Sequence, residues 1–210
     1  MPTHAPRRLR RGLYAITPDG LETEVLLSAV EAALRGGAVL LQYRNKSADA
    51  TRRREQVAAL LPLSMQYDVD LIVNDDLALA QTSGVGVHLG ENDADLAQAR
   101  QRLGADALIG ASCYDDLARA ETAAAAGASY LAFGAFFPSA TKPNARRATP
   151  ELLHRAARYG LPRVAIGGIT PDNARPLIDA GADLVAVVSA VFDTPDIEAA
   201  ATRFARLFKD

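Results

Sequence analysis

Three short runs decide the fold: GGAVLL at residues 36–41, GASYLA at 127–132 and GADLVA at 181–186. Each run places glycine directly before a short apolar segment. Glycine commonly ends a helix in the left-handed conformation, and an unbroken apolar run is typical of a strand covered on both faces. The repeated pattern therefore predicts helices that lead into the strands of a parallel sheet, in units of about one strand and one helix.

The same alternation extends outward over the whole chain. Short apolar runs, which we expect to be strands, are separated by longer amphipathic or alanine-rich stretches, which we expect to be helices. The expected strands are residues 12–17, 39–43, 71–73, 86–88, 107–111, 129–133, 163–166 and 184–188. The expected helices are residues 23–35, 50–67, 77–82, 94–103, 117–126, 150–159, 172–180 and 197–208.

Eight strand–helix units predict an α/β fold, a single-domain (β/α)8 TIM barrel. The chain has 210 residues, and roughly 26 residues for each unit is near the lower size limit of that fold. An open doubly wound sheet is the alternative. That fold usually carries a glycine-rich fingerprint after its first strand, and AITPDG at 15–20 contains none. We expect residues 1–11 to form a flexible basic tail and residues 12–210 to form the barrel.

Composition and charge exclude several classes of protein. Hydrophobic residues make up 49% of the chain, and 23 basic residues face 25 acidic ones, so the chain is not disordered. A sequence pI of about 5.9 argues against nucleic-acid binding by bulk charge, and no stretch approaches the roughly 20 apolar residues of a membrane span. The single cysteine, Cys113, excludes an intramolecular disulfide. We expect a cytoplasmic protein that binds small molecules, and a homo-oligomer is compatible with the sequence.

Polar residues gather where the expected strands end, which is the catalytic face of a TIM barrel. Gln42, Arg44 and Lys46 follow the second strand at alternate positions, so an amide and two cations would face the same side. Such a trio suits an anionic, multiply charged ligand. A solvated strand end is the competing interpretation.

Carboxylates follow the next two strands. Asn74, Asp75 and Asp76 end the third strand, and Asp93 and Asp95 come after the fourth. Acids beside cations are typical of Mg²⁺ that is held jointly by protein and ligand phosphate. Helix capping is the competing interpretation, with Asp75 or Asp76 capping one helix and Asp93 or Asp95 the next.

Hydroxyls and glycines complete the set. Ser112 ends the fifth strand and is expected to be a hydrogen-bond partner, since no nucleophile motif surrounds it. His88 is expected to be a core histidine or one that supports a neighbouring group, and direct chemistry is the alternative. The sequence FPSATK at 137–142 sets hydroxyls beside a lysine, in a loop long enough to predict a mobile, phosphate-contacting lid. Gly168 and residues 188–189 follow the last two strands, where barrels frequently bind phosphate. The constellation predicts two phosphorylated ligands, one of them a diphosphate that needs Mg²⁺.

The constellation resembles the thiamine phosphate synthase family. The matching segments, in the same order and at the same strand ends, are LQYRNK, IVNDD, GVHLGEND, IGASC, FGAFFPSATK, VAIGGI and VAVVSAV. The resemblance implies a Mg²⁺-dependent transferase that condenses hydroxymethylpyrimidine diphosphate with thiazole phosphate, or its carboxylated form, to thiamine phosphate and diphosphate. It also implies a dissociative reaction, in which the departing diphosphate needs charge stabilisation more than the reaction needs a strong base.

The resemblance gives a role to each matching residue. It implies catalysis by Arg44, Lys46, Ser112 and Lys142. It implies contact with the pyrimidine diphosphate by Gln42, Tyr43, Arg44, Asn45, Lys46, Asn74, Ser112 and Lys142. It implies contact with the thiazole phosphate by Ser139, Ala140, Thr141, Gly168, Val188 and Ser189, and coordination of Mg²⁺ by Asp75 and Asp93.

Some positions depart from the family pattern. Asp76 stands where Arg is usual, Glu91 where Gln is usual and Tyr114 where His is common, while Ser139 for Thr keeps a hydroxyl. Asp76 and Glu91 add acids near the expected metal site, which puts the local electrostatics in question. The rival functions are a thiazole tautomerase of the same barrel, a sugar-phosphate epimerase or isomerase, and a catalytically silent barrel. The retained cations and acids favour the synthase, because a tautomerase has no diphosphate to bind.

Overall fold

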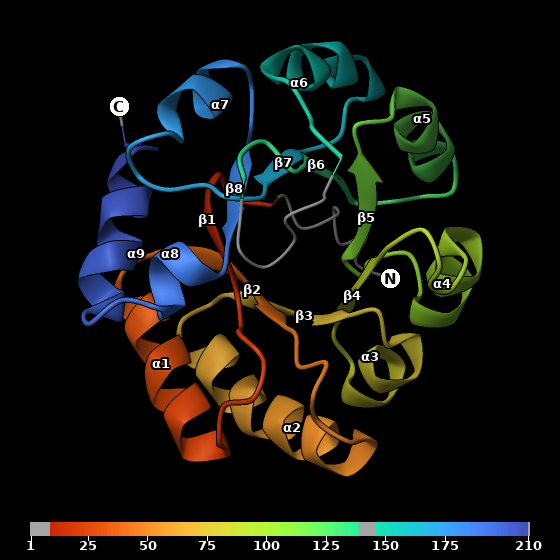
Figure 1. Ribbon diagram of the computed structural model, residues 1–210. Coiled ribbons are helices and arrows are strands. Elements are labelled where there is room, and N and C mark those ends of the chain that lie inside the picture. The colour runs from red at the N-terminus through yellow and green to blue at the C-terminus, as the bar shows by residue number, and fades with distance from the viewer. Residues whose placement is uncertain (1–8, 139–145, 210) are drawn as a thin grey trace.

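The computed structural model describes residues 9–138 and 146–209 and shows a closed barrel of eight parallel strands (Figure 1). The strands pair in chain order, and the first strand closes the barrel against the last. They are β1 (Gly12–Ile16), β2 (Ala38–Tyr43), β3 (Asp70–Asn74), β4 (Gly86–Leu89), β5 (Ile109–Tyr114), β6 (Tyr130–Gly134), β7 (Arg163–Ile166) and β8 (Leu184–Val187). The predicted TIM barrel is confirmed.

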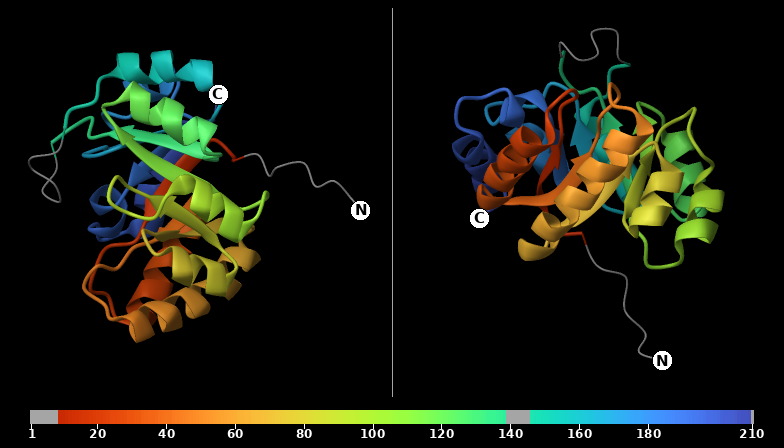
Figure 2. Two further views of the ribbon diagram at one scale, coloured as in Figure 1. Left: turned by 90° about the vertical axis from the view of Figure 1, so that its right-hand side faces the viewer. Right: turned by 90° about the horizontal axis from the view of Figure 1, so that it is seen from below.

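Helices surround the strands on all sides (Figures 1 and 2). They are α1 (Thr23–Arg35), α2 (Ala50–Gln66), α3 (Leu77–Ser83), α4 (Leu96–Leu103), α5 (Leu117–Ala125), α6 (Pro150–Ala156, continued by a 3-10 turn at Ala157–Tyr159), α7 (Arg175–Asp179), α8 (Ser189–Phe192) and α9 (Ile197–Arg206). Each expected strand and helix is present, with ends shifted by no more than three residues. The pattern does not predict α8, because a single turn is too short to show a helical period.

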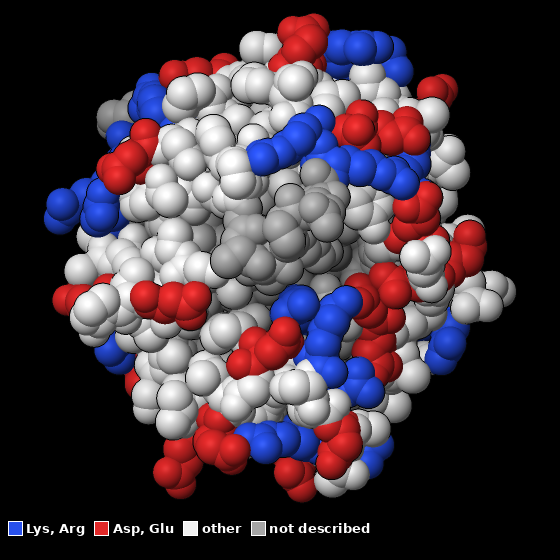
Figure 3. All heavy atoms as spheres, in the orientation of Figure 1, with Lys and Arg blue, Asp and Glu red and all other residues white. Residues whose placement is uncertain are grey.

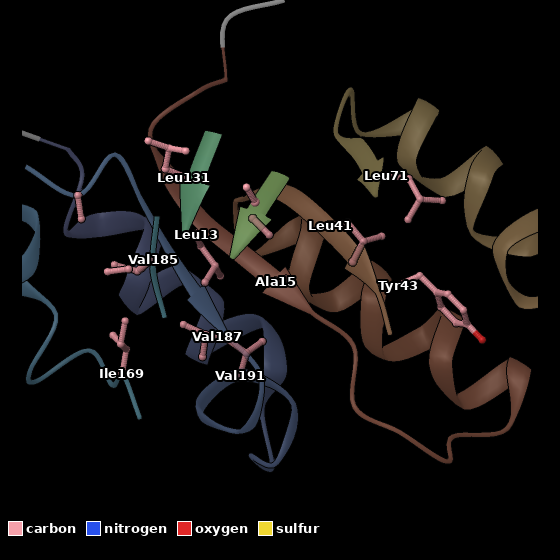
Figure 4. Packing of buried hydrophobic residues seen from close by; sticks show 14 of the residues in the cluster. Leu13, Ala15, Leu41, Tyr43, Leu71, Leu131, Ile169, Val185, Val187 and Val191 are labelled. Carbon is pink, nitrogen blue, oxygen red and sulfur yellow. The ribbon is translucent and has the colours of Figure 1, made fainter. Parts of the chain in front are cut away.

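The alternation of side chains along each strand divides the core into two layers. An outer layer, which includes Leu13, Leu41, Val185 and Val187, packs between strands and helices (Figure 4). Because both faces of the sheet are buried, the strands appear in the sequence as unbroken apolar runs. The inner layer fills the barrel and consists of Tyr14, Ile16, Leu40, Ile72, Tyr130, Ala132, Val164, Leu184 and Ala186.

The glycines of the three repeated runs turn the chain from a helix into the next strand. Gly37, Gly127 and Gly181 have φ angles of 98°, 87° and 98°. Residues with a side chain rarely adopt this left-handed backbone conformation, whereas glycine does so without steric cost. The predicted helix ends are therefore confirmed, although in the first run the turn falls on Gly37, since Gly36 is right-handed with φ −70°.

Within the described ranges, no helix combines the length and the apolar character needed to cross a membrane. Cys113 is fully buried, and burial raises the pKa of its thiol to about 12, as expected for an inert core cysteine. Most of the expected basic tail, at residues 1–8, lies outside the described residues. So do four expected site residues, Ser139, Ala140, Thr141 and Lys142.

Candidate active site

Asp19, in the loop after β1, organises the cations that follow β2. Its carboxylate accepts hydrogen bonds from Arg44 Nη1 and from the backbone N–H of Lys46, both at 2.7 Å. Thr17 Oγ1 adds two bonds to the Arg44 backbone, one to the carbonyl at 2.9 Å and one from the N–H at 2.8 Å. The Arg44 side chain is only 18% exposed. It is therefore held in place rather than left as a solvated strand end.

Two neighbours of these cations point elsewhere. The Tyr43 side chain extends from its strand toward the surrounding helices (Figure 4). Its hydroxyl donates to Gln56 Oε1 on α2 at 2.8 Å. Asn45 is buried; its Oδ1 accepts three hydrogen bonds from nearby loops, and its Nδ2 donates to Gln56. The structure therefore does not bring the side chains of Tyr43 and Asn45 to the mouth of the barrel. Their polar groups shape the loop that carries Arg44 and Lys46.

The acids after β3 and β4 divide into caps and mouth residues. Asp76 and Asp95 each accept a 2.9 Å hydrogen bond from the backbone N–H three residues further on, and so cap α3 and α4. The capping interpretation is correct for these two acids. It leaves Asp75 and Asp93 free of that role.

Asp75 and Asp93 form a close carboxyl pair. The φ of Asp75 is 63°, a conformation that Asp tolerates better than most residues, and its N–H donates to His88 O at 2.8 Å. Asp93 Oδ2 accepts from the Gly90 N–H at 2.6 Å. Partial burial, and then a hydrogen bond with the Asp75 carboxyl, raise the pKa of Asp93 above its ordinary value. Two such groups favour a shared proton or a cation, and Lys46 Nζ already lies 3.3 Å from Asp75 Oδ2.

Nearby arginines neutralise the negative charges of Glu91 and Asp76, the two acids that depart from the family pattern. Glu91 lies 3.3 Å from Arg119 Nη1 and 3.6 Å from Arg146 Nη2. Both guanidinium groups also lie over the Tyr114 ring, 5.4 Å from its centroid. Arg53 Nη1 in turn lies 3.7 Å from Asp76. The additional acids are thus paired locally and do not add free negative charge to the carboxyl pair.

The opposite side of the mouth is built from the ends of β7 and β8, which pair with each other. Gly168 has φ 63°, and a Cβ there would lie 2.4 Å from the carbonyl oxygen of Pro138 and 2.8 Å from that of Phe137. The loop after β7 therefore packs backbone to backbone against the loop after β6. Val188 follows β8 and is the residue before the first turn of α8, which Ser189 begins.

A line of hydrogen bonds crosses the barrel interior below the mouth. Gln42 Nε2 donates a short bond to Tyr14 Oη, which lies 2.8 Å from Tyr130 Oη. Tyr130 Oη lies 2.9 Å from His88 Nδ1, and His88 Nε2 lies 2.9 Å from Ser112 Oγ. Gln42 and Ser112 are therefore joined by Tyr14, Tyr130 and His88. Of these three, the sequence singles out only His88, as a core or supporting histidine. Asn74 ends β3 directly beside His88 of β4.

Sequence reasoning missed Asp19, Tyr14 and Tyr130. Asp19 follows β1, so its place at a strand end was a signal that could have been used. Tyr14 and Tyr130 lie inside apolar strands, where a hydroxyl needs a buried partner. On the surface at the mouth of the barrel, basic and acidic side chains lie next to one another beside the barrel centre (Figure 3).

A closed barrel of eight parallel strands, with its polar groups collected at the carboxyl ends, belongs to the TIM-barrel class of enzymes. A family model described as thiamine monophosphate synthase matches residues 13–191. A thiamine-phosphate synthase from Xanthomonas campestris pv. campestris (strain 8004) is 58% identical over 191 residues, which cover 90% of this chain and 92% of that protein. Another from Thiobacillus denitrificans is 54% identical over 199 residues, 94% of each chain.

A solved structure agrees with the sequence matches. The thiamine phosphate pyrophosphorylase from Pyrococcus furiosus superposes with a TM-score of 0.84 at 34% identity, covering 95% of this chain and 96% of that one. The chain belongs to the thiamine monophosphate synthase family and is a transferase of thiamine biosynthesis. The resemblance noted in the sequence is confirmed.

Proposed function

We propose that this chain condenses hydroxymethylpyrimidine diphosphate with thiazole phosphate, or its carboxylated form, in a Mg²⁺-dependent reaction at the mouth of the barrel. The observation that carries the proposal is the 3.3 Å contact between Lys46 and Asp75. It places the cations that follow β2 against the carboxyl pair that follows β3 and β4. An organic diphosphate with its metal ion needs cations and acids side by side in this way.

The pyrimidine diphosphate would be bound by Arg44 and Lys46. Asp19 occupies Nη1 of Arg44, which leaves other N–H groups of the guanidinium for phosphate oxygens. Ser112 lies two residues before the end of β5, and its hydroxyl is 2.9 Å from His88 Nε2 on the neighbouring strand β4. Gln42, Asn74 and, by family resemblance, Lys142 complete this half of the site.

Asp75 and Asp93 fit a magnesium ion. Their donor set is oxygen only. The pKa of Asp93 is raised by burial and then by the Asp75 carboxyl, and a cation between the two carboxylates would offset their repulsion. Within residues 9–138 and 146–209, no group of three His, Cys, Asp or Glu residues that could hold a metal ion occurs. The carboxyl pair would therefore share the ion with phosphate oxygens and water, as is usual for Mg²⁺. When bound, Mg²⁺ would neutralise charge on the departing diphosphate.

The thiazole phosphate would lie on the side of β7 and β8. Barrels frequently bind phosphate there, with the N-terminus of a short extra helix, and α8 is such a helix. Gly168, Val188 and Ser189 would supply backbone and hydroxyl donors. The family resemblance adds Ser139, Ala140 and Thr141 to this half, and all three lie outside the described residues.

The two halves of the site position the reacting atoms. The bond between the pyrimidine methylene carbon and the diphosphate oxygen breaks with both electrons going to oxygen, and the thiazole nitrogen donates a pair to the same carbon. The carboxylated form would in addition release its carboxyl group as CO₂. Arg44 and Lys46 stabilise the charge on the leaving oxygens. No step requires a side-chain base or a side-chain nucleophile. This agrees with the absence of a recognisable nucleophile motif at Ser112. We place the reaction in the cytoplasm, as the single buried cysteine favours.

The decisive experiment combines both precursors with the purified protein, with and without Mg²⁺. We expect thiamine phosphate and diphosphate in equal amounts, formed only when Mg²⁺ and both precursors are present. Mixtures that lack one precursor are the controls. Isomerisation of a thiazole substrate without consumption of the pyrimidine would instead support a tautomerase, and no reaction in any mixture would support a silent barrel.

Replacing Glu91 by Gln is expected to have little effect on metal use. Its ion pairs with Arg119 and Arg146 are partly exposed, and such pairs contribute about 1 kcal/mol or less. The Mg²⁺ concentration for half-maximal activity should change by less than about threefold. A Mg²⁺ titration of the initial rate measures this, and a shift of about tenfold or more would place Glu91 in the metal site.

Replacing Gly168 by Ala is expected to damage the thiazole phosphate side of the site. The added Cβ would overlap the backbone of Phe137 and Pro138 at a position that already has φ 63°. We expect a loss of about 2 kcal/mol or more in the free energy of unfolding, together with a higher KM for thiazole phosphate. Thermal melting and steady-state kinetics test both effects. Gly160→Ala is the matched control, because Gly160 has φ 69° but open space around its Cβ position.

A further inference from the structure

The donor at one end fixes a single consistent direction for the hydrogen bonds below the mouth, if every hydroxyl hydrogen in the line is to have a partner. Gln42 Nε2 can only donate, so Tyr14 Oη accepts from it. The Tyr14 hydroxyl hydrogen then goes to Tyr130 Oη, and the Tyr130 hydrogen goes to His88 Nδ1. A nitrogen that accepts a hydrogen bond carries no hydrogen. His88 therefore carries its hydrogen on Nε2 and donates it to Ser112 Oγ.

Burial keeps this line intact. Tyr14 and Tyr130 are almost fully buried, and burial raises the pKa of both phenols, so both remain protonated donors. Their rings meet edge to face with centroids 5.9 Å apart, while the Tyr130 and His88 rings stack at 5.6 Å. Each hydroxyl thus has one donor and one acceptor as neighbours, and reversing a single bond would leave a buried polar group without a correct partner.

Gly110 on β5 provides a second, independent observation. A Cβ at this position would overlap Tyr130 Oη and would lie 2.5 Å from His88 Nδ1. The backbone of β5 therefore leaves room for the Tyr130–His88 hydrogen bond and for nothing larger. The sequence accommodates the line of bonds at a position that contributes no side chain to it.

We propose that Gln42, Tyr14, Tyr130, His88 and Ser112 form a one-way hydrogen-bond relay that fixes the Nε2–H tautomer of His88 and turns the Ser112 hydroxyl hydrogen toward the ligand. Tyr130 is then a positioning residue for the reaction. The functional part rests on the function proposed above, because it is the diphosphate that needs donors. A phosphate oxygen only accepts hydrogen bonds. With its own lone pair engaged by His88, Ser112 offers a hydrogen to that oxygen, and in the reverse direction it would offer only lone pairs.

The tautomer is measured on the free protein, without substrates. Nitrogen-15 NMR of the imidazole side chains distinguishes a protonated ring nitrogen from a bare one, and the chain has three histidines. The His88 signals are assigned by their loss in His88→Gln. We expect hydrogen on Nε2 and a bare Nδ1. Hydrogen on Nδ1 would overturn the relay, whatever the activity. If His88 carries its hydrogen on Nε2 but the protein forms no thiamine phosphate, the proposed function would be wrong and the relay would stand.

The role of Tyr130 is tested by Tyr130→Phe, which keeps the ring and removes the central hydroxyl. We expect the His88 tautomer to become mixed and kcat to fall about tenfold or more, as for other residues that orient a functional group, with KM for thiazole phosphate unchanged. Tyr159→Phe is the control; it removes a hydroxyl that donates to Leu117 O outside the barrel.

Two further variants separate a relay from independent contacts. Tyr14→Phe should lower kcat, and Tyr14→Phe combined with Tyr130→Phe should lower it little more than Tyr130→Phe alone, because both break one line of bonds. Losses that multiply would show independent roles. A Tyr130→Phe protein that keeps a single His88 tautomer and the wild-type kcat would also overturn the proposal.

Discussion

Replacing Asp93 by Asn is expected to lower activity at saturating substrates by about tenfold or more and to raise the Mg²⁺ concentration for half-maximal activity. Asn keeps an oxygen that can accept the Gly90 N–H, so the loop is retained, but the charge that would hold the ion is lost. Initial rates over a Mg²⁺ titration measure both quantities. Asp95→Asn is the matched control, since it lies two residues away and Asn is an equally good helix cap.

The same substitution is expected to stabilise the protein in the absence of metal. The pKa of Asp93 is raised in the folded state, so above that pKa the ionised carboxylate opposes folding, and below it the protonated form removes the opposition. At neutral pH without Mg²⁺, Asp93→Asn should therefore melt higher than the wild type, and the difference should shrink as the pH falls. Added Mg²⁺ should stabilise the wild type more than the variant. Equal melting at all conditions would remove Asp93 from the metal site.

The fold could be predicted because its signals are local. An unbroken apolar run such as 184–188 identifies a strand buried on both faces, and a glycine such as Gly127 identifies the helix end before it. Eight such units close into one barrel with few alternatives. Helix α8 could not be predicted, because four residues show no period and its turn depends on packing after β8.

The site was predictable only where chain order places a residue at a strand end. Arg44, Lys46, Asp75 and Asp93 are predicted in this way. In the structure Arg44 and the Lys46 N–H share Asp19, Lys46 contacts Asp75, and Asp75 lies beside Asp93. The sequence alone does not distinguish an acid that caps a helix from one at the mouth, because Asp75 and Asp76 are adjacent and differ only in backbone conformation. Side chains inside the barrel are harder to place. Tyr14 and Tyr130 are 116 residues apart, and only the closed barrel brings their hydroxyls to 2.8 Å.

Replacing Arg44 by Ala is expected to lower kcat/KM for the pyrimidine diphosphate by about a hundredfold or more, comparable to the loss of one oriented donor at a developing charge. Arg44→Lys keeps the positive charge but not the planar fork, so we expect an intermediate loss of about tenfold. KM for thiazole phosphate should stay near its wild-type value in both variants, because in the proposed site the two ligands would contact opposite sides of the mouth. Initial rates with each precursor varied in turn measure these constants.

Asp19 decides whether Arg44 acts as a free charge or as an oriented group. Asp19→Asn keeps an oxygen for the Lys46 N–H but loses the ion pair with Arg44 Nη1. If orientation matters, this variant should lose about tenfold in kcat/KM for the pyrimidine diphosphate even though Arg44 is intact. Asp172→Asn, which breaks a solvent-exposed pair with Arg203, should have no effect. If Asp19→Asn were as active as the wild type while Arg44→Ala was not, Arg44 would act through its charge alone, and the positioning role of Asp19 would be wrong.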